Sequence, residues 1–307
     1  MDYDTLIDAE TWAFIHKTRE CYPDDAGELS IAEQRRIYDA MCEVFHADYP
    51  DGLEVEDRLL GAVPVRIYSA GEPTRTVMYF HGGGFVVGGL ESHDDVCAEI
   101  CAQTGYRVVS VDYRLSPEFK HPAAFDDCWA ATEWALTEFG DPVVLVGDSA
   151  GGNLAAAVAH KSRGRLKHII GQVLIYPGLG GDPDQGSYID HAEAPLLNRA
   201  YILAYKGIRG DDPTNAKDPT LAPLHDTDFS GLPPTVIFSA ECDPLCDDGR
   251  IYRDQLVKAG GRAKWFNEAG MVHGYLRARH CSSRASESFE RIELAIEALG
   301  QGLWPYD

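Results

Sequence analysis

The sequence has no long hydrophobic run, and basic residues are scarce in it. No stretch approaches the roughly 18 consecutive apolar residues that a membrane-spanning helix needs, which argues against a membrane-spanning protein. The chain has 27 Lys and Arg against 49 Asp and Glu, so its formal net charge is −22. Nucleic acids and anionic membrane surfaces bind basic proteins, so we expect neither of them as a partner.

Cysteine patterns typical of disulfide scaffolds or zinc sites are also missing. Eight cysteines are spread over 307 residues without a CxxC pair, which favours reduced thiols, several of them in the core. No cluster has metal-ligand spacing, so we expect neither a metal nor a cofactor. The N-terminal residues lack the basic and apolar regions of a signal peptide, and the expected location is therefore cytoplasmic.

What the chain does contain is a regular alternation of strand-like and helix-like segments. The strand-like runs are 53–60, 63–69, 75–80, 107–112, 142–147, 168–176, 234–240 and 262–267. The helix-like stretches are 92–104, 124–138, 150–162, 247–260 and 284–299. Apolar β-branched runs separated by helices predict a mostly parallel sheet covered on both faces. No helix separates the first two runs, which predicts an antiparallel start.

Two segments fall outside this alternation. The first 48 residues have a helical pattern, and Ser30-Ile-Ala-Glu33 is a capping-box sequence that predicts a helix from there to about His46. Residues 178–232 are rich in Gly, Pro and Asp, with one helical piece near 197–208. A loop of that length in a compact domain is usually functional, so we interpret both segments as parts of one cap over the sheet.

One serine is enclosed by glycines between a predicted strand and a predicted helix. The stretch VVLVGDSAGGNL (143–154) contains G-x-S-x-G, with Ser149 at its centre. A sharp strand-to-helix turn lifts the hydroxyl above the sheet edge and requires small neighbours. The N–H groups at the helix start suit a developing negative charge. A glycine turn with an incidental serine is the alternative, but the strand–turn–helix setting favours a nucleophile.

A serine hydroxyl is a weak nucleophile and needs a base, which in turn needs an orienting carboxylate. In folds with this turn, the acid and then the histidine follow the serine along the chain. The segment FNEAGMVHGYL (266–276), after the last predicted strand, offers His273. The segment FSAECDPLCDDG (238–249) offers four carboxylates, namely Glu241, Asp243, Asp247 and Asp248. Strand ends of a parallel sheet meet at one rim, and spacing alone leaves the four acids open.

A second glycine cluster, HGGG at 81–84, follows the third predicted strand. Acyl transfer passes through a tetrahedral oxyanion, which backbone N–H groups stabilise by roughly 3 kcal/mol each. Glycines let such groups approach closely, so Gly83 and Gly84 are candidate donors together with Ala150 beside the serine. A flexible loop or a phosphate cradle is the alternative, but the lysine of a phosphate-binding loop is absent. His81 is expected to order the loop rather than to react.

Together these segments resemble the hormone-sensitive-lipase family of α/β-hydrolases, in its bacterial carboxylesterase branch. The matching pieces are HGGGFVVGGLESHD (81–94), DYRLSPE (112–118), HPAAFDD (121–127), GDSAGGN (147–153), DPLCDD (243–248) and HGY (273–275). SIAEQRRIY (30–38) is also similar to bacterial acetyl esterases. The resemblance implies Ser149 as nucleophile, Asp243 as the acid and His273 as the base. It further implies an oxyanion hole, formed by Gly83, Gly84 and Ala150.

The resemblance also implies an α/β-hydrolase fold, with a mostly parallel eight-stranded sheet flanked by helices and a helical cap. Residues 1–48 would be N-terminal cap helices, and 49–307 the catalytic domain with a cap insertion at about 178–232. The expected protein is a serine carboxylesterase for small-molecule esters, as a monomer or homodimer. An amidase or peptidase is an alternative, and so is a non-catalytic ligand-binding protein. The non-catalytic protein is disfavoured because the nucleophile, acid and base are all present.

The cap segments contain apolar and aromatic side chains that could close over a small acyl pocket. They are Trp12, Phe14, Tyr188, Leu196, Leu197, Tyr201 and Leu203. A small pocket offers little apolar surface to each further methylene of a long chain. The sequence therefore predicts a preference for short-chain carboxylic esters.

Overall fold

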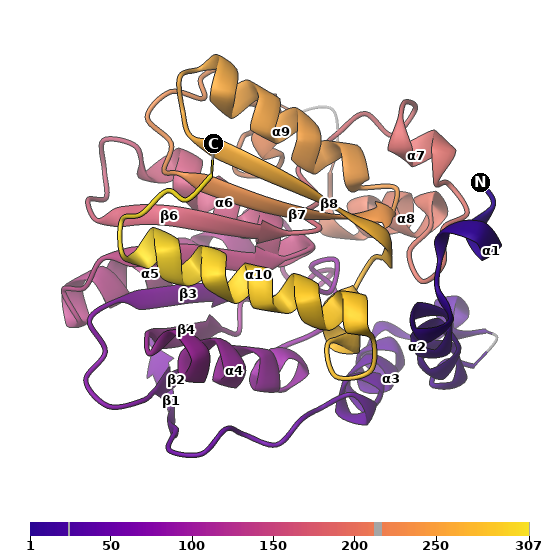
Figure 1. Cartoon of the computed structure of the whole chain (residues 1–307), viewed down its shortest axis with the longest axis horizontal. Helices are drawn as coiled ribbons and strands as arrows, with labels where there is room; N and C mark the ends of the chain where they lie inside the picture. The colour runs from indigo at the N-terminus through magenta and orange to yellow at the C-terminus, as the bar shows by residue number, and fades with distance from the viewer. Residues whose placement is uncertain (24, 212–216, 307) are drawn as a thin grey trace.

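The structure is a computed structural model that describes residues 1–23, 25–211 and 217–306. Its centre is one sheet of eight strands (Figure 1). The strands are β1 (Glu54–Leu60), β2 (Val63–Ser69), β3 (Thr76–Phe80), β4 (Arg107–Val111), β5 (Val143–Asp148), β6 (Ile169–Ile175), β7 (Thr235–Cys242) and β8 (Ala263–Val272). Each strand coincides with one of the predicted runs to within two residues at either end, except that β8 continues five residues beyond the predicted run 262–267.

The strand order across the sheet is β1-β2-β4-β3-β5-β6-β7-β8. β2 pairs antiparallel with both β1 and β4, and every other pairing is parallel. The predicted mostly parallel sheet with an antiparallel start is confirmed. The parallel pairing of β3 with β5 matters most for function, because Phe80 lies opposite Gly147. This register brings the ends of the two strands that precede the glycine clusters side by side.

Helices cover both faces of the sheet, as the alternating pattern predicts. Figure 1 shows α4 (Asp94–Thr104) and α10 (Ser283–Gly300) in front of the sheet. The opposite face carries α5 (Ala123–Glu138), α6 (Ala150–Ser162) and α9 (Cys246–Lys258). Four 3-10 turns in the described residues complete the layers, namely η1 (Ala26–Glu28), η2 (Glu91–His93), η3 (Pro223–His225) and η4 (Tyr275–Ala278).

The hydrophobic core forms two layers, one on each side of the sheet. In β5, Val144 and Val146 pack in the layer beneath α4 and α10, whereas Val143 and Leu145 pack in the layer beneath α6. All four side chains are fully buried, because successive residues of a strand point to opposite faces and both faces are covered. A strand buried in this way holds the residues at its end in one position.

The two predicted cap segments lie together at the end of the sheet where the parallel strands finish (Figure 1). The first contains α1 (Tyr3–Leu6), α2 (Ala9–Glu20) and α3 (Ile31–Val44), and the second contains α7 (Ser187–Asp190) and α8 (Arg199–Arg209). The predicted capping box at the start of α3 is confirmed, since Ser30 and Glu33 bond each other's backbone N–H. Residues 212–216 of the predicted insertion lie outside the described residues.

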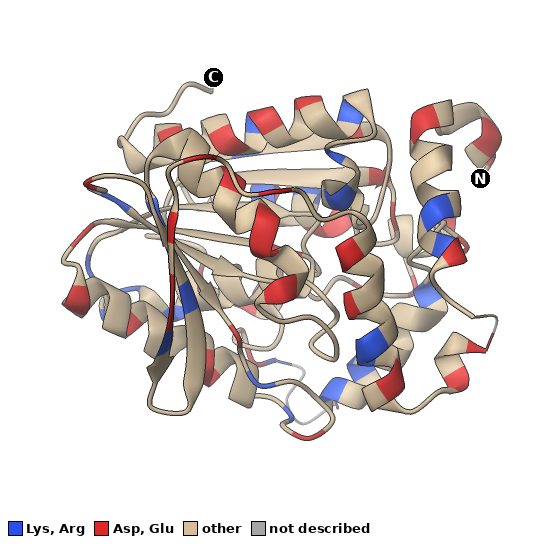
Figure 2. Cartoon of the chain, turned by 90° about the horizontal axis from the view of Figure 1, so that it is seen from below, with Lys and Arg blue, Asp and Glu red and all other residues tan. Residues whose placement is uncertain are grey.

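Acidic residues are spread over the whole fold. In Figure 2, Asp and Glu occur on most helices and loops, with fewer Lys and Arg between them. This distribution agrees with the net charge of −22. Within the described residues, no helix is both long and apolar enough to span a membrane.

Close packing of α6 against β3 gives a test of the fold. A Cβ atom on Gly151 would collide with the backbone carbonyl oxygen of Phe80. Gly151→Ala should therefore lower the free energy of unfolding by about 2–3 kcal/mol, as overpacking in a core does. Gly207→Ala is the control, because a Cβ there meets nothing within 4 Å and an exposed helical alanine is favourable by up to about 1 kcal/mol. Urea unfolding measures both, and a Gly151→Ala protein of unchanged stability contradicts the packing.

Candidate active site

Ser149 lies on the sharp turn between the end of β5 and the start of α6. Its backbone has φ 55° and ψ −115°, a conformation that side-chain-bearing residues seldom adopt and that costs energy. The neighbouring glycines are required by close contacts. A Cβ on Gly147 would overlap the carbonyl group of Gly151, and one on Gly152 would lie 2.8 Å from Cβ of Pro177. The crowded glycines around the serine are therefore a steric requirement of this turn.

Three predicted residues come together through two short hydrogen bonds. His273 Nε2 lies 2.8 Å from Ser149 Oγ, and His273 Nδ1 lies 2.6 Å from Asp243 Oδ2. Asp243 follows β7 and His273 follows β8, so adjacent parallel strands deliver both side chains to one rim of the sheet. Asp243 is fully buried, and its second oxygen accepts the N–H of Leu245 at 2.9 Å. The carboxylate is therefore held with one oxygen directed at the imidazole.

The other three candidate acids hold loops instead of the histidine. Glu241 accepts the N–H of Gly270 at 2.7 Å, just before the histidine loop. Asp247 accepts the N–H of Ser187 at 3.0 Å, at the start of α7. Of the four acids that spacing left open, Asp243 is the one whose carboxylate contacts His273.

Asp248 anchors the beginning of the predicted cap insertion. One of its oxygens accepts three backbone N–H groups, of Leu179, Gly180 and Gly181, and the hydroxyl of Tyr188 at 3.2 Å. Burial raises the pKa of this carboxyl to about 6, and the backbone donors partly oppose the rise. The segment DPLCDD, which contains Asp243, therefore also fixes the first residues of the insertion through Asp248, in the first turn of α9.

The glycine run forms a loop beside the serine. Gly83 and Gly84 have φ 123° and 61°, and the carbonyl of Gly83 accepts the N–H groups of Val86 and Val87, both at 3.0 Å. The N–H groups of Gly83, Gly84 and Ala150 have no hydrogen-bond acceptor among the described residues. All three residues line the cavity that contains Ser149. Unsatisfied backbone donors at such a place are able to bind an anionic oxygen.

Asp148, the residue before the serine, ties the two glycine clusters together. Its Oδ1 accepts the N–H of Gly82 at 2.8 Å and the hydroxyl of Tyr79 at 3.0 Å, and His93 Nε2 lies 3.2 Å away. Burial raises the pKa of Asp148, but His93 and these hydrogen bonds outweigh it and hold the pKa below the ordinary carboxyl range. The G-x-S-x-G pattern leaves the residue before the serine open, so no signal in the sequence pointed to this role of Asp148.

Arg35 connects α3 to the glycine loop. The sequence did not predict this contact. Its Nε donates to the carbonyl of Val86 at 2.8 Å and its Nη2 to the carbonyl of Ser116 at 2.9 Å. The same guanidinium pairs with Glu118 at 2.7 Å. The only signal in the sequence was the segment SIAEQRRIY, where the resemblance included Arg35 without giving it a function.

His81 packs between the glycine loop and Tyr113. It is fully buried, its Nδ1 lies 2.7 Å from the carbonyl oxygen of Gly82, and its ring stacks on Tyr113 at 4.2 Å between centroids. Burial, reinforced by the nearby His93, lowers the pKa of His81 to about 3, so the ring is neutral near pH 7. These contacts agree with the expectation that His81 orders the loop.

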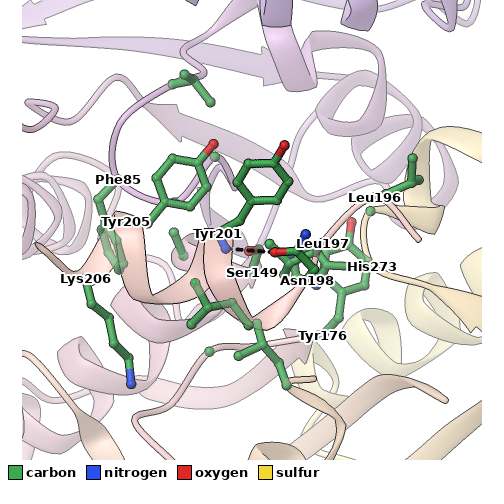
Figure 3. A pocket seen from close by; sticks show the side chains of 18 of the residues that line it. Phe85, Ser149, Tyr176, Leu196, Leu197, Asn198, Tyr201, Tyr205, Lys206 and His273 are labelled. Atoms are coloured by element: carbon green, nitrogen blue, oxygen red, sulfur yellow. Dashed lines mark hydrogen bonds between the residues drawn. The ribbon is translucent and has the colours of Figure 1, made fainter. Parts of the chain in front are cut away.

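A cavity of about 1310 Å³ opens above Ser149 and His273. Its walls include residues of α2, α3, α7 and α8, so both predicted cap segments contribute. In the view of Figure 3, Tyr201 and Tyr205 of α8 project over the region of Ser149. Five of the seven expected side chains line it, namely Phe14, Tyr188, Leu196, Leu197 and Tyr201. Trp12 and Leu203 lie outside the wall, and the cavity is larger than the small pocket that we expected.

Two observations on the described residues concern metal ligands and phosphate-binding lysines. No three His, Cys, Asp or Glu side chains in this part of the chain converge in a way that would hold a metal ion. The glycine loop has no lysine beside it in the cavity wall that could bind a phosphate chain, since Lys206 is the single lysine among the described lining residues and comes from α8. The groups that the site offers for a reaction are the side chains of Ser149, His273 and Asp243 and the unsatisfied backbone N–H groups beside them.

Comparison with known proteins defines the family. A family model described as alpha/beta hydrolase fold matches residues 77–277, which is more than half of the chain. The chain is 39% identical over 271 residues to the protein named "Carboxylesterase NlhH" of Mycobacterium tuberculosis, covering 82% of this chain and 81% of that protein. The chain belongs to the α/β-hydrolase-fold family.

Further relatives place it within that family. The protein named "Ethyl acetate hydrolase" of Pseudomonas putida is 32% identical, over 90% of this chain and 91% of its own length. The crystal structure of an esterase from Pyrobaculum calidifontis superimposes with a TM-score of 0.82 at 31% identity, covering 88% of this chain and 94% of that one. The predicted hormone-sensitive-lipase-like branch is confirmed, and the chain is a carboxylic ester hydrolase.

The environment of Asp148 predicts how stability depends on pH. Its pKa in the folded protein is below the ordinary carboxyl value, so its stabilising contribution is present at neutral pH and is lost as the pH falls through the folded-state pKa. Asp148→Asn should therefore cost about 2–4 kcal/mol at pH 7, with a smaller difference from the original protein at pH 3. Urea unfolding at several pH values measures this.

The control for that series is Asp51→Asn, at an exposed turn. It should leave the free energy of unfolding within about 0.5 kcal/mol at every pH, as exposed substitutions usually do. A constant difference between Asp148→Asn and the original protein from pH 7 to pH 3 would mean that the charge of Asp148 is not what stabilises the fold.

Proposed function

We propose that this carboxylic ester hydrolase acts through a Ser149–His273–Asp243 triad. The observation that carries the proposal is the hydrogen-bonded line from Ser149 Oγ through both ring nitrogens of His273 to Asp243, at the floor of a cavity. Ser149 attacks the ester carbonyl while His273 accepts the hydroxyl proton at Nε2. The buried Asp243 fixes the imidazole orientation and stabilises its cationic form.

The oxyanion of the tetrahedral intermediate accepts hydrogen bonds from the N–H groups of Gly83, Gly84 and Ala150. This assignment is supported by the lack of any other acceptor for these donors among the described residues, and by their place in the cavity wall. The intermediate then expels the alcohol, which takes the proton from His273. Water, deprotonated by the same histidine, attacks the acyl-enzyme and releases the carboxylic acid with Ser149 restored.

The two segments 1–48 and 178–232 form one cap over the catalytic domain of residues 49–307 in this proposal. Their helices line the same cavity, and Arg35 and Asp248 connect them to the loops that carry the reacting groups. The cap sets which esters enter. It also limits the access of bulk water to the acyl-enzyme.

We further propose that the preferred substrates are short-chain esters. The cavity has room for longer chains, but its apolar wall is interrupted by polar groups, because six tyrosine hydroxyls and four cationic side chains contribute to it. A long alkyl chain would have to lie against these groups and displace their water, which costs free energy. The likeness to a protein named for ethyl acetate, a two-carbon acyl ester, supports the same conclusion.

Substitution of the triad tests the mechanism. Ser149→Ala removes the nucleophile and should lower kcat/KM for p-nitrophenyl butyrate by at least about 10⁴-fold, and His273→Ala should do nearly the same. Asp243→Asn should cost a similar factor, because it keeps the shape of the side chain but favours the wrong imidazole tautomer.

Ser283→Ala is the matched control, since it removes an exposed serine hydroxyl at the start of α10. It should retain full activity, and the thermal midpoints of all four proteins should show that they fold. A Ser149→Ala enzyme with a tenth of the original activity would overturn the mechanism.

A series of p-nitrophenyl esters from two to sixteen acyl carbons tests the chain-length proposal. We expect the highest kcat/KM between about two and six carbons and a drop of about a hundredfold beyond ten, since the polar groups in the wall interrupt the apolar surface that added methylenes would need. The initial rate of p-nitrophenolate release measures each ester. Efficient hydrolysis of the sixteen-carbon ester would show that the wall does not limit the acyl chain.

A further inference from the structure

The cavity wall next to the candidate base carries an arginine with free hydrogen-bond donors. Arg277 lies in η4, one turn after Gly274, whose left-handed backbone turns the chain back toward the cavity. Its Nη1 is 3.8 Å from the position that a Cβ on Gly274 would occupy. The guanidinium is therefore beside the loop that holds His273, and Arg277 is among the residues that line the cavity.

One side of this guanidinium is fixed by α3. Its Nε donates to Cys42 Sγ at 3.3 Å and its Nη2 donates to the hydroxyl of Tyr38 at 2.5 Å. The group also lies over the Tyr38 ring, 5.1 Å from the centroid. A guanidinium held in this way has lost much of its conformational freedom before any ligand arrives, which lowers the cost of binding one.

The other side has no partner within the described part of the chain. The two N–H groups of Nη1 have no hydrogen-bond acceptor there, and Nη1 is not among the buried polar atoms that lack one, so it is open to the cavity. The Tyr38 hydroxyl accepts from Arg277, and no acceptor among those residues takes its own proton. The two Nη1 N–H groups of the charged guanidinium and the neutral Tyr38 hydroxyl thus offer three hydrogen-bond donors at one place on the cavity wall.

The charge of Arg277 is also unpaired at close range. No carboxylate of the described residues lies within 4.0 Å of it, although several other shielded arginines have one. Examples are Arg66 with Asp94, Arg209 with Asp211, and Arg279 with Glu99. In a chain with 49 acidic residues, an arginine left without a carboxylate inside the substrate cavity is a distinctive feature.

The negative charge of Asp148 does not occupy the open side. His93 Nε2 stands between the two groups, 3.3 Å from Asp148 Oδ2 and 3.4 Å from Arg277 Nη2. Asp148 is fixed further by Gly82 and Tyr79. The carboxylate of Asp148 therefore attracts the Arg277 guanidinium from the side of Nη2. Both N–H groups of Nη1 remain available to a ligand.

We propose that Arg277, with Tyr38, binds a carboxylate of the substrate, so that the preferred esters carry an anionic group a few bonds from the scissile bond. The proposal rests on the esterase function proposed above and names the substrate class. A guanidinium is the group best suited to a carboxylate, because its planar N–H donors match the carboxylate oxygens. The negative surface of the protein supplies no such attraction, so selection depends on this contact within the cavity.

Two pairs of esters of matched length test the proposal and locate the charge. Ethyl hydrogen glutarate against ethyl pentanoate places it on the acyl side, and 4-acetoxybutanoate against butyl acetate places it on the alcohol side. Titration of the released acid gives kcat and KM for each ester. We expect the original enzyme to favour the anionic member of one pair, and Arg277→Gln to reduce that ratio of kcat/KM by about 10- to 100-fold, chiefly through KM.

Arg277→Lys keeps the charge and loses the planar donors, and it should give an intermediate ratio. Arg36→Gln is the matched control, because it removes a positive charge from the exposed face of α3 outside the cavity wall and should leave the ratio unchanged. An equal loss on charged and neutral esters in Arg277→Gln would make the arginine a structural residue and overturn the proposal. So would an original enzyme that disfavours both anionic esters.

A binding measurement separates this proposal from the proposed mechanism. Calorimetric titration of Ser149→Ala protein with glutarate and with 4-hydroxybutanoate reports on the anion subsite without any turnover. If Ser149→Ala protein binds either anion and the Ser149→Ala/Arg277→Gln double variant does not, the anion subsite is supported even if the triad assignment fails. Hydrolysis of the neutral esters that depends on Ser149, without detectable binding of either anion, upholds the mechanism and overturns the subsite.

Discussion

The buried carboxylate of Asp148 holds the two glycine-rich segments in one relative position. It stands at the end of β5, immediately before Ser149, and accepts the N–H of Gly82 from the loop after β3. The parallel pairing of the two strands sets their register, but loops beyond a strand end are free to move unless something binds them. A nucleophile and oxyanion donors act on the same carbonyl group, so their separation has to be fixed to within about 0.5 Å. Tyr79 and His93 secure this carboxylate in turn.

A second constraint comes from the segment DPLCDD, which serves both the histidine and the cap. Asp243 bonds His273, while Asp247 and Asp248 bond the backbone at 179–187. All of these residues belong to one short turn and the first turn of α9, so a single segment contacts both His273 and residues 179–187. Arg35 makes the corresponding link from α3 to the glycine loop. Residues of both segments, 1–48 and 178–232, are thus hydrogen-bonded to the loops beside Ser149 and His273.

The strands and flanking helices were predictable because each buried strand is a run of apolar, often β-branched residues, as Val143 to Val146 illustrate. The positions of Ser149 and His273 at strand ends followed from the same pattern. Long-range partners were not predictable. Asp148 depends on His93 from the turn before α4, and Arg277 depends on Tyr38 from a helix that lies 239 residues earlier in the chain. The choice among the four acids needed the path of the chain after β7, which spacing does not contain.

The catalytic groups themselves cannot account for selectivity. A serine, a histidine and backbone donors act on any accessible ester carbonyl, so discrimination has to come from the cavity wall. That wall is built mostly by residues of 1–48 and 178–232, the segments whose packing the sequence revealed least. In water at physiological salt the acidic surface acts only over about 8 Å, because ions screen exposed charges. A fixed arginine inside the cavity is screened far less. Under the proposed substrate class, the charge of the surface affects how often an anion arrives, whereas the Arg277 guanidinium, which has no carboxylate within 4.0 Å among the described residues, affects how long it stays.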